Sequence, residues 1–234
     1  MPDSPIQAVF FDLDGTMLDH DAATRAGALG MFSRYRDRLT GSDEHLLQRW
    51  EKLTELHFDR YLRGETSYAG QRRWRIRGLF DVTPSEMSDA EADEVFSVYR
   101  RAYEVNWELF PDVVDTLEAL RSFRLGVITN GGSVHQRQKL EGVGILDRFA
   151  AVVASEDEGV AKPDSEIFKV ACQAVGAPPS ACVHVGDRLA VDAIGARDAG
   201  LTGVWLDRHD SGSRPPGVIR ITRLTELPAL ILES

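Results

Sequence analysis

The sequence predicts an α/β fold, in which a parallel sheet with crossover helices is interrupted by a mainly helical insertion. Two observations support this prediction. Short apolar runs alternate with helix-like stretches after residue 110, and the segment between the first run and residue 110 has helical periodicity without a convincing strand. We therefore expect a core made of residues 1–17 and 109–234, and a helical domain at residues 18–108.

The first apolar run has the features of a buried parallel strand. Residues 6–11 are rich in β-branched and aromatic side chains, and acidic residues and a glycine stop the run. Asp12 and Asp14 stand at its carboxyl end, which in open α/β sheets opens into the ligand crevice. Two acids at this place are candidate catalysts. Taken alone, Asp14 and Gly15 could also form the corner of an ordinary turn.

Further strands are expected at residues 125–128, 150–154, 181–185 and 203–206. The first three of these runs are followed in turn by Thr129 and Asn130, by Lys162, and by Asp187 with Asp192. Right-handed crossovers bring the carboxyl ends of parallel strands to one edge of the sheet. We therefore expect these polar side chains to meet the two acids of the first run in a single crevice.

Such a group of acids predicts a divalent metal ion. Carboxylates at close quarters repel one another, so most can stay ionised only if a cation and a lysine compensate their charge. The expected ligands are all oxygen atoms, without a nearby pair of histidines or cysteines. This donor set favours Mg²⁺ over zinc.

In residue type and order, four motifs resemble the signatures of the haloacid dehalogenase superfamily. They are Asp12-Leu13-Asp14-Gly15-Thr16, Thr129-Asn130, Lys162-Pro163, and Gly186-Asp187 with Asp192. The resemblance extends over nearly the whole chain. It implies a Rossmann-like core with helices on both faces of the sheet, and an α-helical cap inserted after the first motif. The core resembles that of nucleotidases and N-acylneuraminate-9-phosphatases of this superfamily.

The resemblance also implies a role for each motif residue in phosphoryl transfer. Asp12 would be the nucleophile that forms an aspartyl-phosphate, and Asp14 would act first as general acid and then as general base. The Thr129 hydroxyl and the Asn130 backbone amide would hold the phosphoryl oxygens. Lys162 would neutralise the charge on these oxygens.

For the metal, the resemblance implies carboxylate ligands from Asp12 and Asp187, together with the backbone carbonyl of Asp14. Asp192 would either join the metal shell or orient Lys162. An acid near a helix start could also simply complement the helix dipole.

The insertion is expected to decide specificity, because the core motifs recognise only phosphate and metal. A cap of this kind would close to exclude water from the first transfer and admit it for the second. Arg73 and Arg77 would share one face of a helix that also carries Trp74, where they could bind a second anionic group of the substrate. The alternative is a solvated face with Trp74 packed inside the cap.

The expected function is therefore a Mg²⁺-dependent phosphatase acting on small phosphate monoesters such as nucleotides or sugar phosphates. A phosphomutase would keep the same core residues and differ in the cap. A haloacid dehalogenase needs neither Mg²⁺ nor an acid two residues after the nucleophile, so Asp14 and Asp187 count against it. A non-catalytic binding module tends to lose a motif acid, and every motif acid is present.

The composition of the chain disfavours certain classes of partner and indicates a cellular location. The net charge of −10 disfavours nucleic acid polymers and anionic membranes as partners. No apolar run approaches a membrane span, and residues 1–5 lack the features of a signal peptide, so we expect a cytoplasmic protein. The expected oligomeric state is a monomer or a homodimer. Cys172 and Cys182 have no partner spacing and are expected to be buried, reduced thiols.

Overall fold

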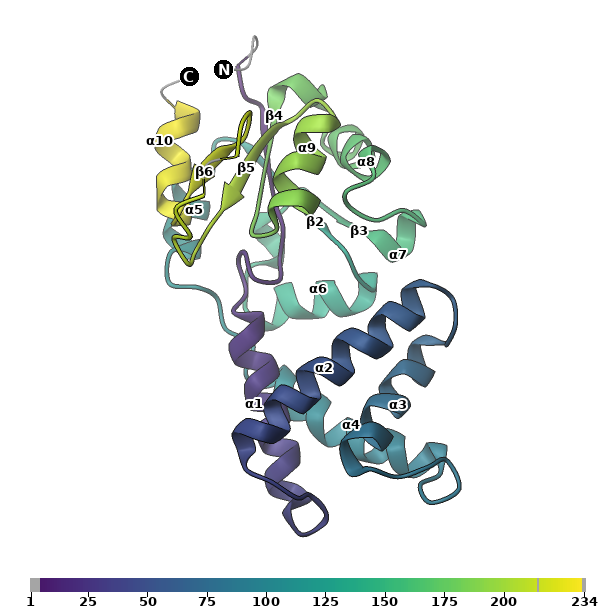
Figure 1. Cartoon of the computed structure of the whole chain (residues 1–234). Coiled ribbons are helices and arrows are strands. Elements are labelled where there is room, and N and C mark those ends of the chain that lie inside the picture. Colours follow the sequence, from purple (N-terminus) through teal and green to yellow (C-terminus); the bar gives the residue numbers. More distant parts are fainter. Residues whose placement is uncertain (1–4, 214, 233–234) are drawn as a thin grey trace. The chain divides into compact units, whose positions relative to one another are not determined.

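A computed structural model describes residues 5–213 and 215–232 of the chain. The chain divides into two compact units, Met1–His20 with Glu108–Ser234, and Asp21–Trp107 (Figure 1). The predicted domain boundaries at residues 18 and 108 lie beside these bounds. That the second unit acts as a cap stays a prediction.

The first unit is built on a six-stranded sheet in the order β3-β2-β1-β4-β5-β6, with every neighbouring pair parallel. The strands are β1 (Ala8–Phe11), β2 (Arg124–Thr129), β3 (Ala151–Ala154), β4 (Cys182–Gly186), β5 (Thr202–Leu206) and β6 (Ile219–Ile221). The predicted α/β class is confirmed. Strand β6 is not predicted from the sequence, because an arginine separates its two isoleucines and leaves no apolar run.

The order of the strands explains why chemistry gathers beside β1. From β1 the chain adds β2 and β3 on one side and β4 to β6 on the other, so the order reverses between β1 and β4. Phe11 is in register with Val127 of β2 and Val185 of β4, which aligns the carboxyl ends of the three strands. Ligand crevices of open α/β sheets form at this kind of switch point. Asp12 directly follows the last residue of β1 and therefore lies at this switch point.

Helices of the first unit pack against this sheet (Figure 1). They are α5 (Val113–Ala119), α6 (Ser133–Gly142), α7 (Ser155–Glu158), α8 (Ser165–Val175), α9 (Gly195–Asp198) and α10 (Leu227–Leu232). Phe10 of β1 shares a buried cluster with Ile167 and Phe168 of α8. Phe11 points to the opposite face of the sheet, where its ring meets Phe149 edge-on. Because β1 is covered on both faces, its ends are firmly placed.

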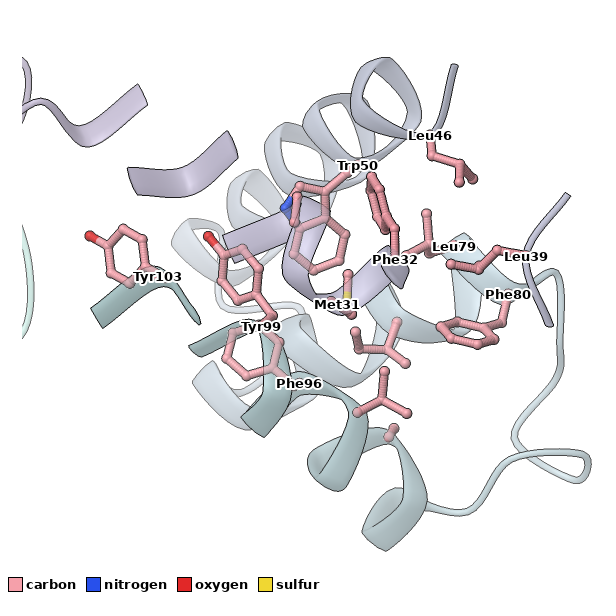
Figure 2. Close-up of a cluster of buried hydrophobic side chains, with 14 of the residues drawn as sticks. Met31, Phe32, Leu39, Leu46, Trp50, Leu79, Phe80, Phe96, Tyr99 and Tyr103 are labelled. Carbon is pink, nitrogen blue, oxygen red and sulfur yellow. The ribbon is translucent and has the colours of Figure 1, made fainter. Parts of the chain in front are cut away.

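The second unit consists of packed helices. These are α1 (His20–Arg34), which begins in the first unit, α2 (Asp43–Leu62), α3 (Tyr68–Phe80) and α4 (Asp89–Glu104). Figure 2 shows its aromatic-rich core, with Phe32, Trp50 and Tyr99 among the buried side chains. Serine N-caps start α2, α3 and α4, and Ser88 forms a capping box with Glu91.

Cys172 and Cys182 are free and buried, as predicted. No helix in the described ranges has both the length and the apolar character needed to cross a membrane.

Candidate active site

The structure brings four motif residues into one cluster at the carboxyl edge of the sheet. Asp12 follows β1, Asp187 follows β4, Lys162 precedes α8, and Asp192 lies in a π-helical turn, Leu189–Ile194. Carboxylate oxygens of the three acids lie within 4.8 Å of one another. The predicted convergence at one sheet edge is therefore seen for these side chains.

Lys162 is the buried cation of this cluster. Its Nζ donates hydrogen bonds to Asp12 Oδ1 at 2.6 Å, Asp192 Oδ1 at 2.7 Å and the Ile128 carbonyl at 2.7 Å. An ammonium group has three protons to donate, and each finds an acceptor here. Burial alone would lower the pKa of Lys162, but the two carboxylates outweigh it and raise that pKa. The lysine is therefore a fixed positive charge.

Asn130 holds the segment that carries this lysine. Its side-chain Oδ1 accepts a hydrogen bond from the Lys162 backbone N–H at 2.8 Å, and its Nδ2 donates to the Lys162 carbonyl at 2.9 Å. The Asn130 side chain thus connects the Thr129-Asn130 motif to the Lys162-Pro163 motif. The predicted phosphate contact of Asn130 involves its backbone amide, which this pairing leaves unused.

One lysine does not balance three acids. Burial and repulsion from Asp192 and Asp187 raise the pKa of Asp12 to about 7, against the lowering effect of Lys162. Burial and repulsion from Asp192 also raise the pKa of Asp187 to about 6. Compensation by a further cation would relieve this repulsion. The donors are carboxylate oxygens, which suit a hard divalent ion such as Mg²⁺.

Asp192 is oriented toward the lysine. Its Oδ1 contacts Lys162 and also lies 3.3 Å from His184 Nε2, while its Oδ2 accepts the Arg188 backbone N–H at 3.0 Å. Burial lowers the pKa of His184, which favours its neutral form. Of the two roles left open for Asp192, the structure contains the contact that orients Lys162; direct metal ligation stays a prediction.

Thr16 and two glycines allow the acids to approach so closely. The Thr16 hydroxyl accepts the Asp187 backbone N–H at 3.0 Å and lies 3.2 Å from Asp12 Oδ2 and 3.3 Å from Asp187 Oδ1. Gly15 has a φ of +82°, and a Cβ there would lie 2.6 Å from Asp187 Oδ2. A Cβ at Gly186 would lie 2.3 Å from Asp192 Cγ. Any other residue at either glycine would displace a site acid.

Asp14 lies in a different environment from Asp12. Its two carboxylate oxygens accept hydrogen bonds from Lys139 Nζ at 2.8 and 2.7 Å, and His20 Nδ1 lies 3.5 Å from Oδ1. Burial would raise the pKa of Asp14, but Lys139 and His20 together hold it well below its usual range. Asp14 is therefore an anion with its own lysine. Its carboxylate is not among the metal-binding candidates, and ligation through its backbone carbonyl stays a prediction.

Thr129 is connected to Asp14 through Gln136, a residue that was not predicted from the sequence. Gln136 on α6 donates from Nε2 to the Thr129 hydroxyl at 2.6 Å and to Asp14 Oδ2 at 3.2 Å. Lys139 was missed as well. The only available signal was a glutamine and a lysine three residues apart on the helix that follows the second motif.

The arginines predicted to bind substrate are engaged within the second unit. Arg73 pairs with Asp89 and Asp93, each at 2.6 Å, and Arg77 pairs with Asp89 at 2.6 Å and the Met87 carbonyl at 3.0 Å. These contacts favour a structural role, and substrate binding by either arginine stays a prediction.

The aromatic residue between these arginines, Trp74, is only partly packed in the unit. Trp74 is about one-third exposed, at 36%, and its ring stacks on His57. Trp74 therefore packs against His57 while part of its ring is exposed at the surface of α3, and both alternatives for this helical face stay predictions.

Arg208 is a third residue that could not be predicted from the sequence. Its guanidinium forms two 3.0 Å hydrogen bonds to the Asp112 carboxylate and one of 2.6 Å to the Thr16 carbonyl. It also stacks on Phe110. Arg208 thereby ties the first motif to the segment where the chain re-enters the core.

Comparisons with known proteins agree with this arrangement. A family model described as haloacid dehalogenase-like hydrolase matches residues 6–200. Pyrimidine 5'-nucleotidase YjjG of Escherichia coli is 30% identical, with 95% of this chain and 96% of that protein covered. Human N-acylneuraminate-9-phosphatase is 30% identical, with 97% and 94% covered.

Solved structures show the same fold. The HAD-hydrolase YfnB of Bacillus subtilis, bound to magnesium, matches with a TM-score of 0.76 and 24% identity, covering 97% of this chain and 99% of that one. A 2-haloacid dehalogenase of Pseudomonas syringae matches with a TM-score of 0.70 and 28% identity over the same shares. The resemblance drawn from the four motifs is confirmed: this chain belongs to the haloacid dehalogenase-like hydrolases.

Proposed function

We propose that this hydrolase is a Mg²⁺-dependent phosphatase that cleaves small phosphate monoesters through an aspartyl-phosphate. The observation that carries the proposal is the contrast between two acids of one motif. Asp12 lies among carboxylates beside Lys162. Asp14, two residues later, is outside this cluster of carboxylates and pairs with Lys139. Two carboxylates in different environments can take two different roles.

In the first half-reaction, an oxygen of the Asp12 carboxylate attacks phosphorus and the bond to the ester oxygen breaks. Asp14 gives a proton to the leaving alkoxide, which departs as an alcohol. In the second half-reaction, the Asp14 carboxylate takes a proton from water, whose oxygen attacks phosphorus and releases Asp12 with inorganic phosphate. Asp14 ends this step protonated. Because Lys139 favours the Asp14 anion, the proton that Asp14 gives to the next leaving group has to be held against this ion pair.

The remaining motif residues stabilise charge on the transferring group. Lys162, adjacent to Asp12 at 2.6 Å, would neutralise charge on the phosphoryl oxygens. The Thr129 hydroxyl and the Asn130 backbone amide would hold these oxygens. Mg²⁺, held by Asp12 and Asp187 with the Asp14 carbonyl and with Asp192 nearby, would supply further charge neutralisation when bound.

The proposed substrates are nucleotides or sugar phosphates, which is supported by the nucleotidase and the N-acylneuraminate-9-phosphatase among the relatives. A phosphomutase remains the alternative in the same chemical class. Although 2-haloacid dehalogenases are among the structural neighbours, Asp14 and Asp187 argue for phosphoryl transfer in this chain. The expected cytoplasmic location and the monomeric or homodimeric state also stay predictions.

The proposal is tested by phosphate release from a panel of nucleotides, sugar phosphates and phosphoglycolate, with Mg²⁺ or with EDTA, for wild type and Asp12→Asn. We expect release that requires both the metal and Asp12. Isomerisation of a sugar phosphate without free phosphate would identify a mutase instead. Turnover by Asp12→Asn within tenfold of wild type would overturn the nucleophile assignment.

A further inference from the structure

Helix α6 places two buried polar side chains on one face. Gln136 and Lys139 are three residues apart, so they lie side by side on the helix, and they are only 2% and 3% exposed. Neither belongs to the motifs from which the function was proposed. Both reach the same carboxylate, that of Asp14.

We infer that Gln136 and Lys139 are positioning residues that hold the Asp14 carboxylate for hydrolysis of the aspartyl-phosphate. This inference rests on the proposed function and concerns its second half-reaction. There, Asp14 has to accept a proton from a water molecule aimed at phosphorus. A general base must be held within hydrogen-bond reach of that proton, so its orientation controls the rate.

The contacts fix the carboxylate in two ways. Lys139 Nζ bonds both oxygens, at 2.8 and 2.7 Å, which restricts rotation about the bond to the carboxylate carbon. Gln136 Nε2 bonds Oδ2 at 3.2 Å and the Thr129 hydroxyl at 2.6 Å. An amide nitrogen carries two protons, so both bonds can form together. Gln136 thus sets the spacing between Asp14 and the hydroxyl proposed to hold phosphate.

A purely structural role would not require these side chains. Desolvating an ammonium group is unfavourable, and a buried ion pair is often no more stabilising than apolar side chains of similar volume. An apolar residue could therefore have anchored α6 to the sheet equally well. The lysine and the glutamine instead fix the position of the Asp14 carboxylate relative to α6.

The loss of Lys139 should therefore affect the two half-reactions differently. With an aryl phosphate, the leaving phenolate needs little help from an acid, so kcat/KM reports formation of the phosphoenzyme. Hydrolysis of the phosphoenzyme still needs Asp14 as a base. This second step is expected to limit kcat with an aryl phosphate. We expect Lys139→Met to lower kcat on the order of 10²-fold, with kcat/KM nearly unchanged. The variant should accumulate phosphoenzyme and show a burst of phenolate.

The experiment compares wild type with Lys139→Met, Lys139→Arg, Gln136→Leu and the control Lys169→Met. Lys169 lies on α8, is 47% exposed and pairs only loosely with Glu166, at 3.8 Å. Rapid-quench phosphoenzyme levels and steady-state kcat and KM are measured for each with an aryl phosphate. Lys139→Arg should recover part of kcat because it retains the charge and the donors. Gln136→Leu should show a smaller effect of the same kind.

A stability cycle supplies a readout that does not depend on activity. Lys139→Met removes the lysine from the Asp14 anion and leaves only the longer contacts with His20 and Gln136, so adding Asp14→Asn should raise the melting temperature of the single variant. Equal falls in kcat and kcat/KM for Lys139→Met, or kinetics like those of Lys169→Met, would overturn the inference while leaving the phosphatase intact. Absence of phosphate release by the wild type would instead overturn the proposed function together with the role assigned here.

Discussion

The Lys162 ammonium lies 2.6 Å from Asp12 Oδ1 and 2.7 Å from Asp192 Oδ1, so one buried cation joins the first and last motifs of the core. The two acids come from positions 180 residues apart in the chain. Their common partner stands on a third segment, braced by Asn130. The stability of the core and the charge of the site therefore depend on the same contact.

Replacement of this lysine should destabilise the protein strongly. In Lys162→Met, two buried carboxylates lose their cation, which we expect to lower the free energy of unfolding by roughly 3 kcal/mol at pH 8. The loss should be smaller at pH 5, where these acids can take up protons. Urea denaturation at both pH values measures the effect, with Lys169→Met as a control. A loss that matched the control at pH 8 would contradict the central role of this ion pair.

The stability of the metal-free protein should depend on pH through Asp12 and Asp187. Folding raises their pKa values from 3.8 to about 7 and about 6, so the folded state binds protons more tightly than the unfolded chain. Their contribution to stability is therefore present below pH 4 and is lost as the pH rises through 6 and 7.

Added Mg²⁺ should reverse this loss, because it favours the ionised acids and binds only the folded site. Melting temperatures in EDTA and in Mg²⁺ should consequently differ more at pH 8 than at pH 5. This comparison needs no substrate. Equal Mg²⁺ effects at the two pH values would show that these carboxyl groups do not form the metal site.

Asp187→Asn should raise the Mg²⁺ concentration needed for half-maximal activity by about tenfold or more, because a charged oxygen ligand becomes a neutral one. Activity toward an aryl phosphate is titrated with Mg²⁺ for this variant and for Asp198→Asn. Asp198 is exposed and pairs with Arg197, away from the acid cluster. An unchanged titration for Asp187→Asn would exclude Asp187 as a ligand.

In the second unit, two buried arginines of α3 should respond differently to replacement. Arg77→Met removes a pair with Asp89 and leaves the Met87 carbonyl without its donor, which should cost about 1–3 kcal/mol. Arg75 stacks on Trp50 at 4.2 Å, and within the described part of the chain no carboxylate pairs with it. Arg75→Met should therefore change stability by no more than about 1 kcal/mol.

Chemical denaturation of both variants tests this difference, and kinetics on two esters test specificity. If Arg77 binds substrate, its replacement will change the ratio of kcat/KM for a sugar phosphate to that for an aryl phosphate. A structural role predicts an unchanged ratio. A larger stability loss in Arg75→Met than in Arg77→Met would contradict the packing described for α3.

The carboxyl edge of the sheet could be predicted from the sequence because the signals that indicate a strand are local. A short apolar run that ends in Asp12 or Asp187 needs no knowledge of distant residues, and parallel topology then places both at one edge. The roles of Lys139 and Gln136 could not be found in this way. Which face of α6 turns inward depends on how the helix packs on the sheet, and that is a tertiary property.

The contacts of Arg73 and Arg77 could not be predicted either, because they too depend on tertiary packing. Spacing alone places Arg73 and Arg77 on one helical face, but Asp89 and Asp93, which neutralise them, lie on α4. Only the packing of α3 against α4 shows that this face is occupied. Strand β6 was missed for a related reason, since pairing with β5, rather than an apolar run of its own, makes it a strand.

The most direct test of the account is to trap the intermediate. Wild-type protein with Mg²⁺ and a phosphate ester is quenched, reduced with borohydride and digested, and position 12 is identified by mass spectrometry. An aspartyl-phosphate at Asp12 would be reduced to homoserine at that position, which is the result we predict. Homoserine at a different acid, or none despite continuing phosphate release, would contradict the proposed mechanism.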